Sequence, residues 1–149
     1  MENTIIDQMQ FEVITSDYPA IGSKSLEVKK KLKNFFPTSD YLRRLSVCIF
    51  EVEANLTIHT TAGGHLDILV YPDRVRVVST DSGPGIKELN KALTPGFSTA
   101  PESARQLGFG GGVGLNNIKR FADLFFITSA KTGTNFIFEV WNDEDMSTA

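Results

Sequence analysis

The chain has 149 residues, of which 41% are hydrophobic and 22% charged, as is typical of one soluble globular domain. Its net charge of −3 gives no electrostatic reason to expect a nucleic-acid partner or a membrane surface. No apolar run approaches the roughly 18 residues of a membrane span, and one cysteine with two distant histidines matches no zinc-ligand spacing. The lone Cys48 and the absence of a leader-like start lead us to expect a cytoplasmic protein.

Helical and alternating patterns follow one another along the chain. Phe11 and Val13 mark a short strand, and residues 23–36 have the spacing of a helix that Pro37 ends. Thr38-Ser39-Asp40 then caps a long helix that runs to about residue 59 or 60. The remaining expected elements are a hairpin over residues 66–77, a short helix over 86–93, a loop over 94–113, a helix over 114–124 and strands over 125–129 and 134–141.

These elements predict an α+β two-layer sandwich in which helices cover one face of a mixed, mostly antiparallel sheet. A doubly wound fold is disfavoured because strands and helices do not alternate along the chain. We expect one domain over residues 10–141, an N-terminal extension over 1–9 and a disordered acidic tail over 142–149.

Five glycines fall within residues 108–114, directly before an expected helix. Free backbone N–H groups and the positive end of a helix dipole suit the binding of phosphate. The segment lacks the lysine of a P-loop, and it lacks the spacing and preceding strand of a dinucleotide-binding fingerprint. A flexible linker is the alternative, although linkers rarely lead directly into an amphipathic helix.

The long helix has one continuous apolar stripe that predicts its core-facing side, made of Leu42, Leu45, Ile49, Val52 and Leu56. Glu51 points far from this stripe, and Asn55 follows it one turn later on the same line. A carboxylate and an amide oxygen so placed can hold an attacking hydroxyl and a hard cation such as Mg²⁺. The alternative is that Glu51 and Asn55 are an ordinary pair of surface side chains without a ligand. We expect Glu53 to face solvent and His59 to be structural.

A third candidate follows the expected hairpin, in the segment Asp81-Ser82-Gly83-Pro84-Gly85. The glycines let the backbone approach a flat ligand closely. An ionised aspartate accepts hydrogen bonds, so it suits an exocyclic amine such as that of adenine. Taken alone, the segment also fits an ordinary strand-to-turn connection that caps the next helix.

The order of these segments resembles the GHKL superfamily of ATP-binding domains, which includes gyrase, the heat-shock chaperone ATPase, histidine kinases and MutL. The resemblance covers about residues 10–141 and rests on four motifs: Glu51-x-x-x-Asn55, Asp81-x-Gly83-x-Gly85, Gly108-x-Gly110-x-Gly112-x-Gly114 and Gly133-Thr134. Within the superfamily, Gly96-Phe97-Ser98-Thr99 and residues 114–120 look most like the anti-sigma regulatory serine kinases. A Bergerat-type fold is therefore implied.

The resemblance also implies roles for single residues. Glu51 would be the general base, Asn55 would ligate Mg²⁺, and Asp81 would receive the adenine amine with support from Thr134. The implied nucleotide-binding residues are Asn55, Asp81, Gly83, Gly85, Gly108, Gly110, Gly112, Val113, Gly114 and Thr134. Arg105 is a candidate phosphate contact or an ordinary exposed arginine.

The implied function is an ATP- and Mg²⁺-dependent serine/threonine kinase that transfers the γ-phosphoryl group to a small regulatory protein. The implied partners are an anti-anti-sigma-like protein, a sigma factor and a second copy of the chain. The alternative is a non-catalytic, nucleotide-gated binding module. A histidine kinase catalytic part and a stand-alone ATPase motor fit less well. The lysine run at residues 24–33 is expected to be a solvated helix face, or else an edge that docks an acidic partner.

Overall fold

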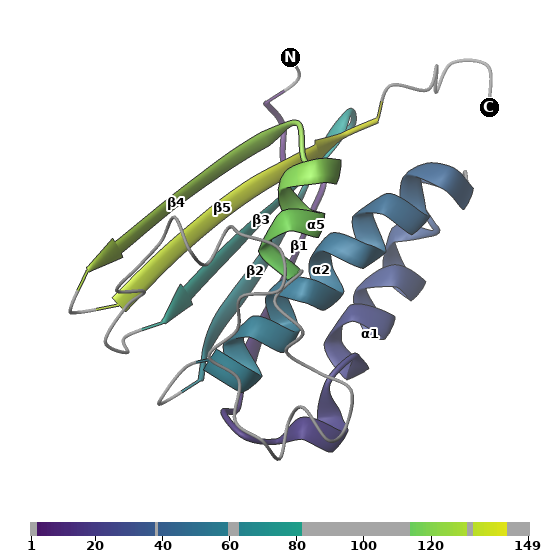
Figure 1. The fold of residues 1–149 in the computed structure, drawn as a ribbon. Helices are drawn as coiled ribbons and strands as arrows, with labels where there is room; N and C mark the ends of the chain where they lie inside the picture. Colours follow the sequence, from purple (N-terminus) through teal and green to yellow (C-terminus); the bar gives the residue numbers. More distant parts are fainter. Residues whose placement is uncertain (1–2, 38, 60–62, 82–113, 131–132, 143–149) are drawn as a thin grey trace.

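The structure is a computed structural model that describes residues 3–37, 39–59, 63–81, 114–130 and 133–142. Within these ranges one sheet carries its helices on a single face, as Figure 1 shows, which confirms the expected two layers. The strands are β1 (Asp7–Val13), β2 (Gly64–Val70), β3 (Arg74–Asp81), β4 (Leu124–Ala130) and β5 (Gly133–Trp141). The helices are α1 (Ser23–Leu32), α2 (Ser39–His59) and α5 (Gly114–Phe121), with the 3-10 turn η1 (Tyr18–Ala20) before α1.

The strand order is β1-β2-β3-β5-β4, and each of these four neighbouring pairs is antiparallel. The expectation of a mixed sheet is therefore wrong for the described strands. A short turn over residues 71–73 joins β2 to β3, and such turns reverse the chain. β3 and β4 run in the same direction, but β5 lies between them, so no parallel pair forms.

The core lies between the sheet and α2. All five residues of the predicted stripe on α2 are at most 3% exposed, which confirms that side of the helix as core-facing. The strands contribute alternate residues to the same core, and Leu66, Ile68, Val75 and Val77 are fully buried. The strand periodicity and the helix periodicity thus point to one shared interior.

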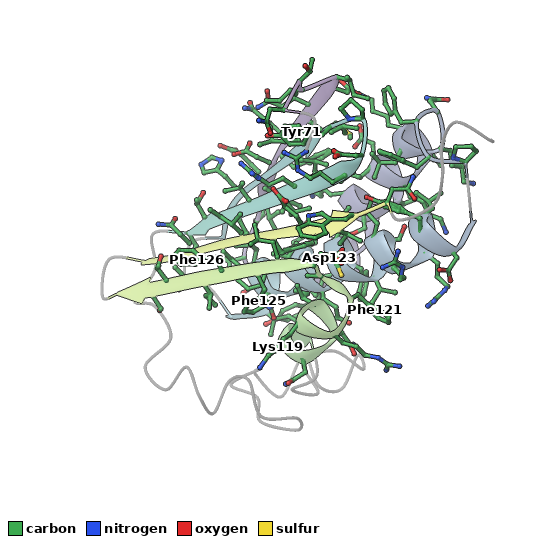
Figure 2. The ribbon with its side chains drawn as sticks, turned by 90° about the horizontal axis from the view of Figure 1, so that it is seen from above. Tyr71, Lys119, Phe121, Asp123, Phe125 and Phe126 are labelled. Atoms are coloured by element: carbon green, nitrogen blue, oxygen red, sulfur yellow. The ribbon has the colours of Figure 1, made fainter. Side chains whose placement is uncertain are left out.

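Neighbouring side chains of β4 show the difference between the two faces of the sheet. Phe125 packs edge to face against Phe136 on the helix-covered side, with ring centroids 4.9 Å apart. Phe126 points to the opposite face and is 57% exposed (Figure 2). No helix in the described ranges covers that second face (Figure 1).

An ion network lies on the helix-free face, across β3 and β5. Glu139 forms ion pairs with Arg74 and Arg76, and its other neighbour is the Trp141 ring nitrogen, which donates to it at 2.9 Å. Burial would raise the pKa of Glu139, but the hydrogen bonds from Trp141 and Arg76 hold it below its ordinary value. Glu139 is thus an ionised and paired carboxylate.

Several element boundaries differ from the expected ones. α1 ends at Leu32, because the backbone N–H groups of Asn34 and Phe35 then bond to carbonyl oxygens three residues earlier, as in a tighter 3-10 turn. α5 ends at Phe121, before the Asp123 backbone N–H pairs with Glu139 of β5. β1 already begins at Asp7, inside the expected N-terminal extension. Of the tail expected over residues 142–149, the structure describes Asn142. Its backbone N–H donates a hydrogen bond to the Asp73 carbonyl oxygen.

The expectation that Glu53 faces solvent is wrong, because its side chain is 1% exposed. Its carboxylate lies at the start of α1 and accepts hydrogen bonds from the backbone N–H groups of Gly22 and Ser25 at 3.1 and 3.0 Å. The Ser25 hydroxyl donates to it at 2.6 Å. The Gly22 cap position has no side chain to satisfy these donors, so Glu53 caps α1 from a different helix.

Candidate functional site

Glu51 lies half-buried on the side of α2 that faces α5. Asn117 of α5 donates a hydrogen bond from Nδ2 to Glu51 Oε1, at 3.5 Å. Burial raises the pKa of Glu51 above its ordinary value, and the hydrogen bond from Asn117 offsets part of this rise. A carboxylate with a raised pKa and a fixed orientation is suited to accept a proton.

Asn55 follows Glu51 by one helical turn and is also half-buried. Its amide oxygen and the Glu51 carboxylate are hard oxygen donors, which Mg²⁺ prefers. Within the described ranges, no group of three or more His, Cys, Asp and Glu side chains could hold a metal by itself. This donor set fits a magnesium ion that is held by one or two protein oxygens and otherwise by substrate phosphates.

Three polar side chains meet where β3, β5 and β4 lie side by side. Asp81 is paired with Thr134, and Thr134 is paired with Ser129 on its other side. Ser129 Oγ and Thr134 Oγ1 are 3.1 Å apart and share a hydrogen bond. All three side chains are half-buried. We call Asp81, Thr134 and Ser129 the polar row.

The N-terminus of α5 lies at Gly114, the last of the clustered glycines. The first turn of a helix leaves backbone N–H groups unpaired, and these attract anions. Asn116 lies in this turn, and its buried Nδ2 atom has no hydrogen-bond partner among the described residues. This helix start therefore has donors to offer to a phosphate.

The structure thus describes Glu51, Asn55, Asp81 and Thr134, and it describes Gly114 as the first residue of α5. The other predicted nucleotide-binding residues lie outside the described residues: Gly83, Gly85, Gly108, Gly110, Gly112 and Val113. The expected helix over residues 86–93, the expected loop over 94–113 and Arg105 lie outside them as well.

Asn117, Ser129 and Gly64 belong to this region, although sequence reasoning gave them no role. A Cβ atom on Gly64 would lie 2.3 Å from the Thr80 carbonyl oxygen and 3.3 Å from Asp81 Cβ. Only glycine therefore lets β2 approach the end of β3 so closely. The adjacent glycines at 63 and 64 were the available signal, but nothing local indicates that Asp81 lies against Gly64.

The affiliation of the chain follows from a match to a protein family. The profile described as histidine kinase-, DNA gyrase B- and HSP90-like ATPases matches residues 41–144, well over half of the chain. The chain belongs to this ATPase family. Membership in this GHKL family confirms the resemblance inferred from the four motifs, and it identifies the chain as an ATP-binding domain.

Two curated proteins are similar to this GHKL domain. The serine/threonine-protein kinase RsbT of Bacillus subtilis is 29% identical over 122 residues, which are 78% of this chain and 83% of RsbT. An anti-sigma F factor of Oceanobacillus iheyensis is 28% identical over 102 residues, which are 63% of this chain and 64% of that protein. Both are distant relatives of the chain.

A solved structure supports the fold of this GHKL domain. The catalytic domain of histidine kinase ThkA superposes with a TM-score of 0.50, covering 92% of this chain and 97% of that one. The two sequences are 19% identical, so the likeness concerns the fold.

None of the helices in the described ranges has the length and apolar character that crossing a membrane requires.

Proposed function

We propose that this GHKL domain is a serine/threonine protein kinase that transfers the γ-phosphoryl group of ATP to a small regulatory protein. The observation that carries the proposal is the half-buried Glu51, oriented by Asn117 and one turn from Asn55. Transfer to a hydroxyl needs a base for the hydroxyl proton. The similarity to RsbT, a serine/threonine-protein kinase by name, supports the choice of acceptor.

The proposed chemistry assigns each group one task. Bound Mg²⁺ would neutralise charge on the phosphates. The Asn55 oxygen would contribute one ligand to that ion, and backbone N–H groups at the start of α5 would hold phosphate oxygens. Glu51 would accept the proton of the attacking hydroxyl, while Asn117 keeps one carboxylate oxygen occupied and leaves the other for the proton. Asp81 and Thr134 would bind the adenine.

We further propose that the partners are an anti-anti-sigma-like protein, which would be the substrate, and a sigma factor. The similarity to an anti-sigma F factor supports this. A homodimer is part of the same proposal. Lys30, Lys31 and Lys33 of the lysine run are exposed on α1 and at its end. These three are solvated as expected from the sequence, whereas Lys24 and Lys29 are half-buried. The three exposed lysines are available to an acidic partner.

Labelling with γ-³²P-ATP tests the proposal. The purified protein is incubated with labelled ATP, Mg²⁺ and the soluble proteins of its source cells. We expect one small protein to carry label that survives acid, because phosphoserine and phosphothreonine are acid-stable whereas phosphohistidine is acid-labile. Glu51→Gln should bind ATP as the wild type does and transfer no label. Label that is lost in acid would refute the serine/threonine assignment.

The non-catalytic binding module is the second candidate, because a nucleotide site can change a protein surface without any transfer. ATP at one hundred times its dissociation constant should stabilise the fold by about 2.7 kcal/mol in either case. Labelling by the wild type separates the two functions, and Glu51→Gln is the control that binds ATP without transfer. If wild type and variant bind ATP equally and neither labels any protein, the module is correct and the kinase proposal is wrong.

A further inference from the structure

Ser129 is the one member of the polar row that the proposed function leaves without a task. Residues that face each other on neighbouring strands point to the same side of the sheet. Ser129, Thr134 and Asp81 therefore share the helix-covered side, at the edge of the core. A control position is adjacent, because Thr128 lies on the same strand, points to the opposite side and is exposed.

The next residues inward on the same side are apolar on both β4 and β5. Ile127 is half-buried and lies opposite Phe136, which is 4% exposed and packs on Phe138 and Phe125. The polar row thus borders the edge of the apolar core, where Ile127 is partly exposed. A purine base has apolar faces and a polar edge, and sites for such ligands combine apolar walls with a few placed polar groups.

The hydroxyls of Ser129 and Thr134 share one hydrogen bond, in which either oxygen can be the donor. Each hydroxyl has a single proton to donate. When Ser129 donates to Thr134, the proton of Thr134 is left for another acceptor. Asp81, as a carboxylate, only accepts. The row then presents an acceptor beside a donor, at Asp81 and Thr134.

This order of groups matches adenine and opposes guanine. The exocyclic amine of adenine donates, and the ring nitrogens on either side of it, N1 and N7, accept. Guanine carries a carbonyl oxygen where adenine carries the amine. That oxygen would face the Asp81 carboxylate, and two acceptors repel each other.

We propose that Ser129 is a positioning residue that orients the Thr134 hydroxyl and thereby favours adenine over guanine nucleotides. The inference rests on the proposed role of Asp81 and Thr134 in binding the base. It adds Ser129 to that role and assigns it an effect on the choice of nucleotide rather than on phosphoryl transfer.

Calorimetric titration with ATP and with GTP tests the inference on wild type, Ser129→Ala, Ser129→Thr and Thr128→Ala. Ser129→Ala should weaken ATP binding about threefold to tenfold, the usual effect of one hydrogen bond. It should change GTP binding far less. Ser129→Thr keeps the hydroxyl and should restore ATP affinity, and Thr128→Ala should behave as the wild type. Urea unfolding of each variant shows whether the fold is intact.

Two analogues of ATP sharpen the test. In 1-deaza-ATP and 7-deaza-ATP a carbon replaces one of the two ring nitrogens beside the amine. Whichever nitrogen receives the Thr134 proton, its absence should remove the difference between wild type and Ser129→Ala. If Ser129→Ala binds ATP as tightly as the wild type, or if it loses ATP, GTP and both analogues equally, the inference is wrong. A wild type that binds no ATP would overturn the proposed function as well.

Discussion

Replacing Glu53 by alanine should destabilise the protein more than any surface change on α1. Glu53 accepts hydrogen bonds from the Gly22 and Ser25 backbone, from the Ser25 hydroxyl and, at 3.4 Å, from the Lys24 backbone. Alanine would leave these donors without their acceptor in a nearly dry place, because both Glu53 and Ser25 are buried. Each buried donor left without an acceptor costs roughly 1–3 kcal/mol, so the loss of the shared acceptor should cost about 3–5 kcal/mol in all.

Glu53→Gln gives a graded comparison, because it keeps the shape and one acceptor oxygen but loses the charge. Its amide NH₂ would face backbone N–H donors on one side. We therefore expect a loss of about 1–3 kcal/mol, the usual range for one unsatisfied buried polar group. Glu27→Ala is the matched control, since Glu27 is exposed on α1 and surface changes usually stay within about 0.5 kcal/mol.

Urea unfolding at pH 7, followed by circular dichroism, measures these differences as shifts of the midpoint at constant slope. The expected order of destabilisation is Glu53→Ala, then Glu53→Gln, then Glu27→Ala. If Glu53→Ala and Glu27→Ala unfold at the same urea concentration, the carboxylate does not hold the start of α1, and the reasoning from these contacts is refuted.

Three further predictions concern single groups. Asn117→Ala removes the hydrogen bond that lowers the pKa of Glu51, so the Glu51 pKa should rise; carboxyl-carbon NMR of the titrating side chain measures it, and an unchanged value would contradict the contact. Glu139 has a lowered pKa, so its ionised form stabilises the fold above the ordinary value of 4.5, and that contribution is lost as the pH falls toward the lower folded-state pKa. Stability should therefore fall less steeply below pH 4.5 in Glu139→Gln, which urea midpoints across pH would show. Burial raises the pKa of Cys48 to about 12, so iodoacetamide at pH 8 should modify it only in unfolded protein. Mass spectrometry with and without urea checks this, and rapid labelling of the native protein would disprove it.

Local patterns were enough to predict most elements. The turn Tyr71-Pro72-Asp73 separates two alternating segments, and the structure has β2 and β3 there. The apolar stripe of α2 was correct because a helix face is set by spacing within one segment. The order of the motifs along the chain was sufficient for the family, since the match to known ATPases covers them.

Contacts between segments were beyond this kind of reasoning. Glu53 was assigned to solvent because the spacing within α2 places it outside the apolar stripe. Nothing in that spacing shows that α1 begins against it with an unsatisfied cap. Asn117 and Ser129 gained their roles in the same way, since each meets a partner on another element. A sequence pattern states which side of an element is apolar, but it does not state which donor lies opposite.

The position of β5 has a consequence for how the protein is made. β5 lies between β3 and β4, although it follows both along the chain. A ribosome that has released β4 has therefore released a strand with no described neighbour to pair with, and its Phe125 lacks its packing partner Phe136 until β5 emerges. Unpaired apolar strands in a growing chain invite association with other chains. The polar row is split over β3, β5 and β4, so a nascent chain gains the proposed binding site for the base only when β5 is in place.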